Sequence, residues 1–139
     1  MLAIENTFFD LAKSCGKDCL VICDRGAMDA AAYMERQAFN EILKRNNMNN
    51  VELRDNRYNQ VIHLMTAAKG AEAFYQIEDN PVRSEGIELA RKLDSLTIES
   101  WIGHPYIDVI DNSVASFDSK MAAMIEVGAL GRCSSGSTW

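Results

Sequence analysis

One run of five apolar residues constrains the fold of this chain more than any other feature. Residues 19–23 read Cys-Leu-Val-Ile-Cys, and Asp24, Arg25 and Gly26 follow at once. Because the run has no polar alternation, it indicates a strand that is covered on both faces, as in a parallel sheet with helices on either side. Ligands of such sheets bind at the carboxyl ends of the strands, where Asp24 and Arg25 would project. A helix cap at Asp24 and a surface charge at Arg25 are equally consistent with the sequence.

The rest of the chain alternates between helical and strand patterns. Periodic apolar residues predict helices over 2–13, 28–45, 84–101 and from 116 onward, and apolar runs predict strands over 61–66 and 106–110. Three strands separated by helices imply parallel crossovers. We therefore expect an α/β fold, a partial doubly wound parallel sheet of three strands with flanking helices, in one domain over residues 1–127. The glycine- and serine-rich segment 128–139 has no period, so it is expected to be a disordered tail.

Charge and hydropathy exclude several classes of partner. The 139 residues include 14 basic and 20 acidic side chains, a net charge of −6, without a long run of either sign. This balance argues against nucleic acid and anionic membrane surfaces as electrostatic partners. No apolar run approaches the roughly 18 residues of a membrane-spanning helix, so we expect a cytoplasmic protein without a transmembrane segment.

The cysteines and histidines do not predict a metal centre. Cys19 and Cys23 would lie about 13 Å apart on one strand, which is too far for them to share an ion. His63 within a strand and His104 within a loop have no partner at ligand spacing. We therefore expect reduced, buried thiols and no direct metal ligand.

Several separate blocks of the chain carry a resemblance to a known family. They are residues 21–26, 28–29, 32–34, 53–55, 57–58, 61–64, 67–72, 83–91 and 103–106. In this order they resemble the P-loop, AAA-type domain of the TRPL translocation defect protein 14 family, a nucleotide-kinase-like domain related to ribosylnicotinamide kinases. The resemblance covers residues 1 to about 125. It implies Mg²⁺ and GTP or ATP as cofactors of the complete parent protein.

The resemblance also assigns roles to individual residues. Asp24 resembles the acid that holds Mg²⁺ through water or accepts the proton of a substrate hydroxyl, and Arg25 resembles the arginine that orients a substrate or phosphate. Arg83 and Arg91 resemble lid arginines that stabilise the transferring phosphoryl group. Asn112 and Ser113 follow the last strand, where related kinases contact the nucleobase.

Structural interpretations of the lid and base residues remain open. Arg83 also suits a solvated loop, and Arg91 could pair with Glu88 or Asp94 on a helix surface. Helix capping explains Asn112 and Ser113 equally well.

The family's phosphate-binding motif is not found in this sequence. No Gly-x-x-x-x-Gly-Lys-Ser/Thr segment, whose backbone amides and lysine hold phosphates, occurs in the 139 residues. We therefore expect a truncated domain that does not bind nucleotide tightly and is inactive as an enzyme on its own. For the parent, the resemblance implies membrane-protein trafficking with GTP and phosphoinositide binding and membrane-protein cargo; the alternative is a nucleoside or ribosylnicotinamide-like kinase.

The same resemblance predicts a gap in the sheet. The expected strand order is 2-3-1-4-5, and the strands at 19–23 and 61–65 would be separated by the strand that carries the phosphate motif. Without that strand, both segments lose ladder partners on facing edges. We expect either that they pair with each other in a three-stranded sheet, or that the chain is partly folded and prone to aggregate.

Overall fold

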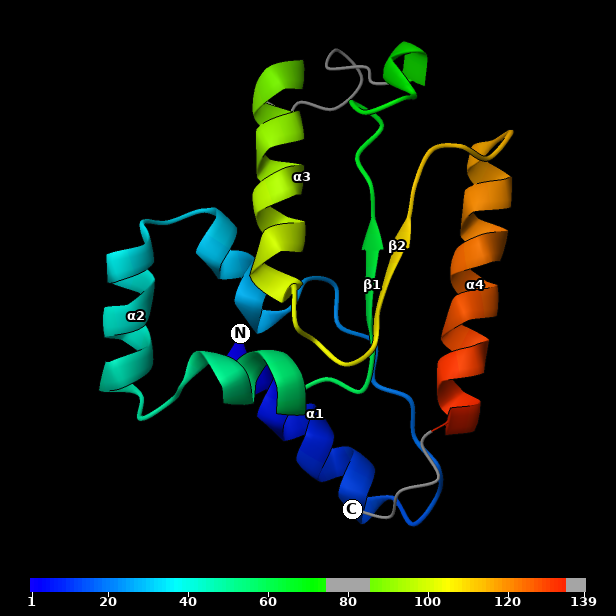
Figure 1. Cartoon of the computed structure of the whole chain (residues 1–139). Helices are drawn as coiled ribbons and strands as arrows, with labels where there is room; N and C mark the ends of the chain where they lie inside the picture. The colour runs from blue at the N-terminus through cyan, green and yellow to red at the C-terminus, as the bar shows by residue number, and fades with distance from the viewer. Residues whose placement is uncertain (75–85, 135–139) are drawn as a thin grey trace.

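The computed structural model describes residues 1–74 and 86–134, whose helices surround a small parallel sheet (Figure 1). The elements follow in the order α1 (Leu2–Ser14), a 3₁₀ helix (Ala27–Ala32), α2 (Arg36–Arg45), a π-helical turn (Glu52–Asn56), β1 (Val61–Leu64), a 3₁₀ turn (Glu72–Phe74), α3 (Ile87–Trp101), β2 (Ile107–Ile110) and α4 (Phe117–Ser134). This mixed α/β architecture confirms the predicted class and is consistent with part of a P-loop fold.

The sheet consists of β1 and β2, which run parallel with Val61 opposite Ile107 and Leu64 opposite Ile110. Its two faces are covered by different helices. His63 points toward α3, where its ring meets a carboxylate, and the neighbouring Ile62 points toward α4, where its side chain lies near Gly128. Figure 1 shows α3 and α4 on opposite sides of the strand pair. Both strands were predicted from their apolar runs, and both are a little shorter than predicted.

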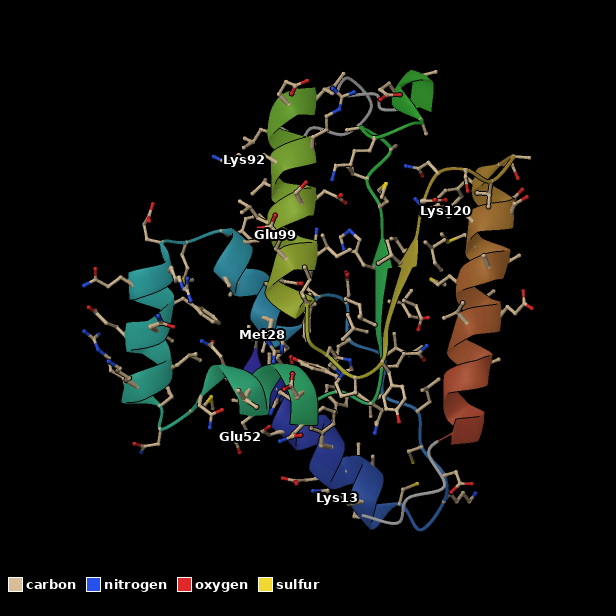
Figure 2. All side chains as sticks on the ribbon, viewed as in Figure 1. Lys13, Met28, Glu52, Lys92, Glu99 and Lys120 are labelled. Atoms are coloured by element: carbon tan, nitrogen blue, oxygen red, sulfur yellow. The ribbon has the colours of Figure 1, made fainter. Side chains whose placement is uncertain are left out.

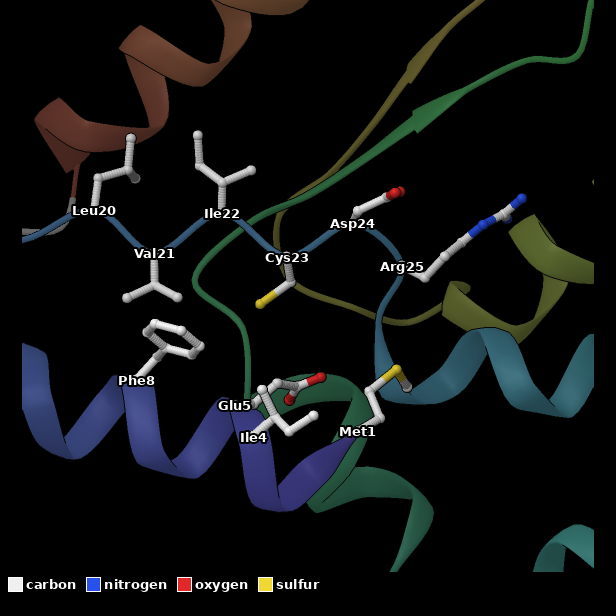
Figure 3. A pocket seen from close by; sticks show the side chains of 10 residues that line it. All are labelled: Met1, Ile4, Glu5, Phe8, Leu20, Val21, Ile22, Cys23, Asp24 and Arg25. Atoms are coloured by element: carbon white, nitrogen blue, oxygen red, sulfur yellow. The ribbon is translucent and has the colours of Figure 1, made fainter.

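The prediction of a third strand at residues 19–23 is wrong. These residues form no strand, and no backbone hydrogen bond joins residues 19–25 to another part of the described chain. The segment is nevertheless extended, with Val21 and Cys23 directed at α1 and Leu20 and Ile22 directed away from it (Figure 3). An apolar run predicts that a segment will be buried, but a strand also needs backbone hydrogen bonds to a neighbouring strand, and this segment makes none among the described residues. The expected pairing of 19–23 with 61–65 is therefore also absent.

The main hydrophobic core lies beside the end of α3 rather than under the sheet. Trp101, only 3% exposed, packs there with residues of the 3₁₀ helix, α2 and the π turn. The other buried members of this cluster are Ala27, Met28, Phe39, Leu43 and Leu53. The ring of Tyr58 meets Trp101 edge to face, with centroids 5.3 Å apart.

A buried polar network ties α1 to this core. Glu5, 6% exposed, accepts hydrogen bonds from Arg57 Nε at 2.7 Å and from the hydroxyl of Tyr58 at 3.1 Å. The Tyr58 oxygen in turn accepts the amide of Ala27 at 2.7 Å. Burial, followed by the neighbouring Glu5, raises the pKa of Tyr58 to about 12. The network holds α1 beside the start of the 3₁₀ helix, where the 20–25 segment ends.

The predicted helix over 28–45 is divided in two. Residues 27–32 form a 3₁₀ helix because the Asp29 carboxylate accepts both the Gly26 amide at 2.9 Å and the indole N–H of Trp101 at 2.6 Å. The bond to Gly26 is local and the bond to Trp101 is tertiary; the regular helix α2 begins only at Arg36. Local periodicity does not contain such a long-range constraint.

Three further expectations need correction or lie outside the described residues. The structured region does not stop at residue 127, because α4 continues through Gly128 to Ser134; isolated glycines cost a helix only about 1 kcal/mol each. The thiol of Cys19 is exposed rather than buried and that of Cys23 is partly exposed, because the 19–23 run lacks the expected cover. The predicted start of the helix over 84–101 lies outside the described residues, and α3 begins after Gly86.

Candidate functional site

The carboxyl edge of the sheet is held together by one lysine and one asparagine. Lys120 of α4, 7% exposed, donates from Nζ to the carbonyl oxygen of Met65 and to Oδ1 of Asn112, both at 2.6 Å. The Asn112 amide then donates to the carbonyl oxygens of Thr66 at 2.8 Å and Lys69 at 2.7 Å. Figure 2 shows Lys120 where α4 passes the end of β2. These bonds connect the loops that follow both strands.

A second charged cluster adjoins this edge and centres on Asp94 of α3. Oδ2 of Asp94 accepts Lys69 Nζ at 2.8 Å, and Oδ1 accepts the amide of Thr66 at 2.8 Å and lies 3.1 Å from Nε2 of His63. The Asp94 and His63 side chains are 6% and 9% exposed, whereas Lys69 is 28% exposed. The loop after β1 is thus fastened to α3 on one side and to α4 on the other.

Burial and hydrogen bonding shift the pKa of Asp94 in opposite directions. Burial alone would raise the pKa of Asp94, but the hydrogen bonds from Lys69 and the Thr66 amide, with the charges of His63 and Lys69, lower it below its usual value. Burial lowers the pKa of Lys120, against the opposing effect of Asp94 and Asp111. The edge therefore holds an ionised carboxylate beside partly desolvated lysines.

The turn after β2 leaves two polar side chains facing solvent. The amide and hydroxyl of Ser113 donate to Oδ1 of Asp111 at 2.9 and 2.5 Å, and both residues are exposed. The same bonds lower the pKa of the Asp111 carboxyl. Asn112, between them, has its amide group fully engaged within the edge, so Asp111 and Ser113 are the groups of this turn that can meet a ligand.

Arg91 is engaged on three sides. Its guanidinium donates to the carbonyl oxygen of Ala68 at 2.6 Å and to the carboxylates of Glu88 and Glu72, each at 2.7 Å. The pairing with Glu88 matches one of the two partners weighed from the sequence. The other, Asp94, pairs with Lys69 instead.

Asp24 and Arg25 lie at the opposite end of α3 from Arg91. Both are exposed and border the groove between α1 and the 20–25 segment, and Arg25 has a left-handed backbone with φ 70° (Figure 3). The adjacent Gly26 packs against Trp101, the last residue of α3, whereas Arg91 lies near its first turn. Ten residues of helix correspond to about 15 Å. The structure therefore brings Arg91, Asn112 and Ser113 to one end of the molecule and Asp24 and Arg25 to the other; Arg83 lies outside the described residues.

Sequence reasoning did not identify Asp94, Lys69 and Lys120 as site residues. Asp94 carried a signal, because it falls on the buried stripe of α3 at helical spacing from Ala90 and Trp101. An acid on such a stripe requires a buried partner. Lys120 carried no comparable signal, because its reach to β1 depends on how α4 packs against the sheet.

One of the comparisons with known proteins identifies a family. A family model described as AAA domain matches residues 2–118, which is most of the chain. No curated protein and no solved structure matches the chain.

Among the described residues, no helix is long and apolar enough to cross a membrane, and no three His, Cys, Asp or Glu side chains converge as a metal site.

Proposed function

This chain belongs to the AAA domain family, and we propose that it forms the base-side part of a nucleotide site at the carboxyl edge of its parallel sheet. The observation that carries the proposal is the fixed turn 111–113. Lys120 and Asn112 tie it to the end of β1, while Asp111 and Ser113 remain exposed. A carboxylate and a hydroxyl at a strand end are groups that can accept from a nucleobase edge or a ribose. GTP and ATP are the ligands we assign to this edge.

The phosphate side of the site is less complete in these residues. Asp24 is an exposed carboxylate of the kind that holds Mg²⁺ through water, and Arg25 beside it suits a phosphate oxygen, but both lie at the other end of α3 from the turn 111–113. Bound Mg²⁺ would neutralise charge on the phosphates. The 139 residues contain no Gly-x-x-x-x-Gly-Lys-Ser/Thr segment, however, and most of the phosphate binding energy of such domains comes from that loop. We therefore assign this chain weak nucleotide binding.

The arrangement favours nucleotide binding over phosphoryl transfer. A transfer site needs its acid and its arginines around one phosphoryl group. Here Asp24 lies near the Trp101 end of α3, and the helix rises about 15 Å from Arg91 to Trp101; Arg91 is already bound by Glu72 and Glu88. This separation argues against phosphoryl transfer. For the parent protein we propose the trafficking role that the family resemblance implies, in which GTP and phosphoinositide binding serve the sorting of membrane-protein cargo. Kinase activity toward a nucleoside or ribosylnicotinamide-like acceptor is the alternative.

Amide chemical shifts in the ¹⁵N-labelled chain, titrated with Mg²⁺–GTP and Mg²⁺–ATP, test the proposal. We expect millimolar affinity, about −4 kcal/mol, with the shifts concentrated at residues 66–70 and 111–113. Asp111→Asn should weaken binding about tenfold, whereas Lys92→Ala, an exposed residue of α3 (Figure 2), should leave it unchanged.

Three results would contradict the assignment. Shifts confined to residues 20–26 would move the site to the other end of α3. A micromolar, Mg²⁺-dependent site in calorimetry would show that the phosphate motif is not the main source of affinity. Product formation with a panel of nucleosides would replace the binding role by the kinase alternative.

A further inference from the structure

The free edge of β1 presents backbone groups that have no partner. Val61 and Met65 donate to β2, at Tyr106 and Ile110, so alternate residues of β1 face β2. Ile62 and Leu64, between them, therefore direct their amides and carbonyls at the opposite edge. Neither backbone has a hydrogen-bond partner among the residues that the structure describes. A free strand edge of this kind is a template for another strand.

The same chain contains an extended segment, residues 19–23, whose backbone lacks the hydrogen-bond partners that the free edge of β1 could supply. Residues 19–23 are extended and make no backbone hydrogen bonds within the described part of the chain. Val21 and Cys23 face α1, but Leu20 and Ile22 on the other face are 59% and 83% exposed (Figure 3). Five consecutive apolar residues are typical of a strand that is covered on both faces, and this segment is covered on one.

From this complementarity we infer that two copies of the chain associate by strand pairing: residues 19–23 of each copy add to the free edge of β1 in the other. Every copy carries both the edge and the segment, so the exchange is reciprocal and closes on a two-fold axis. Added beside β1, the segment would extend a sheet whose faces are already covered by α3 and α4, which buries Leu20 and Ile22.

The charges around the segment do not oppose such pairing, although the whole chain carries a net charge of −6. Lys17 and Asp18 precede it, and Asp24 and Arg25 follow it, so the flanks are neutral in sum. Two copies can therefore approach at this place without local repulsion of like charges. The groove between α1 and the segment, lined by Met1, Ile4 and Phe8, adds apolar surface on the face of the segment opposite Ile22 (Figure 3).

The test combines oligomeric state with amide hydrogen exchange on the full chain. Sedimentation should show a concentration-dependent dimer. Exchange at the amides of Ile62 and Leu64 should slow at least tenfold between dilute and concentrated samples, while Val61 and Met65, already bonded to β2, change little. Ile22→Lys should abolish the dimer, since its side chain is exposed in the single copy and the fold does not depend on it.

The matched control is Ile102→Lys, which changes another exposed isoleucine, 63% exposed, after α3. It should leave the dimer intact, and circular dichroism of both variants reports their folding. A chain that stays monomeric at all concentrations would overturn the inference. So would a dimer in which Ile62 and Leu64 exchange freely, a dimer equally weakened by Ile102→Lys, or open-ended aggregates in place of a closed pair.

Discussion

Replacing Asp94 by asparagine should remove a large part of the stability of this domain. The side chain is 6% exposed and joins α3 to β1 through His63 and to the following loop through Lys69 and the Thr66 amide. Asparagine keeps the shape and one acceptor oxygen but loses the charge. Its amide nitrogen must then face either Lys69 or His63, and both are donors to the carboxylate in the native protein.

The magnitude follows from the burial of the partners. Breaking a buried ion pair costs about 3–5 kcal/mol, because the remaining charge loses its partner in a poorly solvated place. Lys69 is 28% exposed and can recover some hydration, which puts the expected loss near the lower end, about 3 kcal/mol. For a chain of this length, that corresponds to a fall in melting temperature of about 10 °C.

The assay is a urea melt followed by the fluorescence of Trp101, which is 3% exposed in the folded chain. Glu99→Gln is the matched control, since it makes the same acid-to-amide change at an exposed position of the same helix (Figure 2). The control should change the free energy of unfolding by less than about 0.5 kcal/mol. If Asp94→Asn is as stable as the control, the ion-pair network does not stabilise the domain and the reasoning is refuted.

A pH series adds an independent readout for Asp94. Its pKa is lowered in the folded chain, so its contribution to stability is present above the unfolded pKa of about 3.9 and is lost as the pH falls through the folded pKa. The difference in stability between the native chain and Asp94→Asn should therefore be largest near neutral pH and shrink below about pH 4. A difference that stays constant down to low pH would show that the asparagine acts through packing rather than through charge.

Two further predictions concern the other end of α3. Gly26→Ala should destabilise the domain by about 1–3 kcal/mol in a urea melt, because the new Cβ would lie 2.4 Å from the buried Trp101 ring; Gly86→Ala, where a Cβ meets nothing within 4 Å, is the control. Ultraviolet absorbance during a pH titration should show Tyr58 ionising near pH 12, identified by the transition that is lost in Tyr58→Phe and kept in Tyr106→Phe. Because the pKa of Tyr58 is raised in the folded chain, the contribution of Tyr58 to stability is present below about pH 10 and is lost as the pH rises toward 12. Ionisation of Tyr58 near pH 10 would contradict the buried network.

Much of the regular structure follows from sequence periodicity. The helix α1 and the strands β1 and β2 lie where their apolar patterns predict them. The errors occur where structure depends on a distant partner. Residues 19–23 have the composition of a strand but pair with no strand in the described part of the chain. The predicted helix over 28–45 begins instead as a 3₁₀ helix, in which the Asp29 carboxylate accepts the indole N–H of the distant Trp101.

The candidate site could be predicted only in part, for the same reason. The position of Asn112 and Ser113 after a strand identifies the carboxyl edge from the sequence alone. The engagement of the Asn112 amide with two carbonyl oxygens depends on how the loops after β1 and β2 meet, which no local pattern specifies. Asp94 shows what such patterns can still reveal, since an acid on a buried helical stripe signals a partner even when the partner is unknown.

The buried charges explain how so small a sheet keeps a defined carboxyl edge. Two parallel strands of four residues each form few ladder bonds, and a two-stranded sheet is marginal in isolation. Lys120 and Asn112 add four charged or amide hydrogen bonds beyond the ends of the strands, and Asp94 attaches the loop after β1 to α3. These side chains therefore fix the loops after β1 and β2, a role that additional strands would fill in a larger sheet. Because these side chains already fix the turn 111–113, a nucleotide that binds there pays no entropic cost for ordering the turn. Its affinity must come from direct contacts with Asp111 and Ser113.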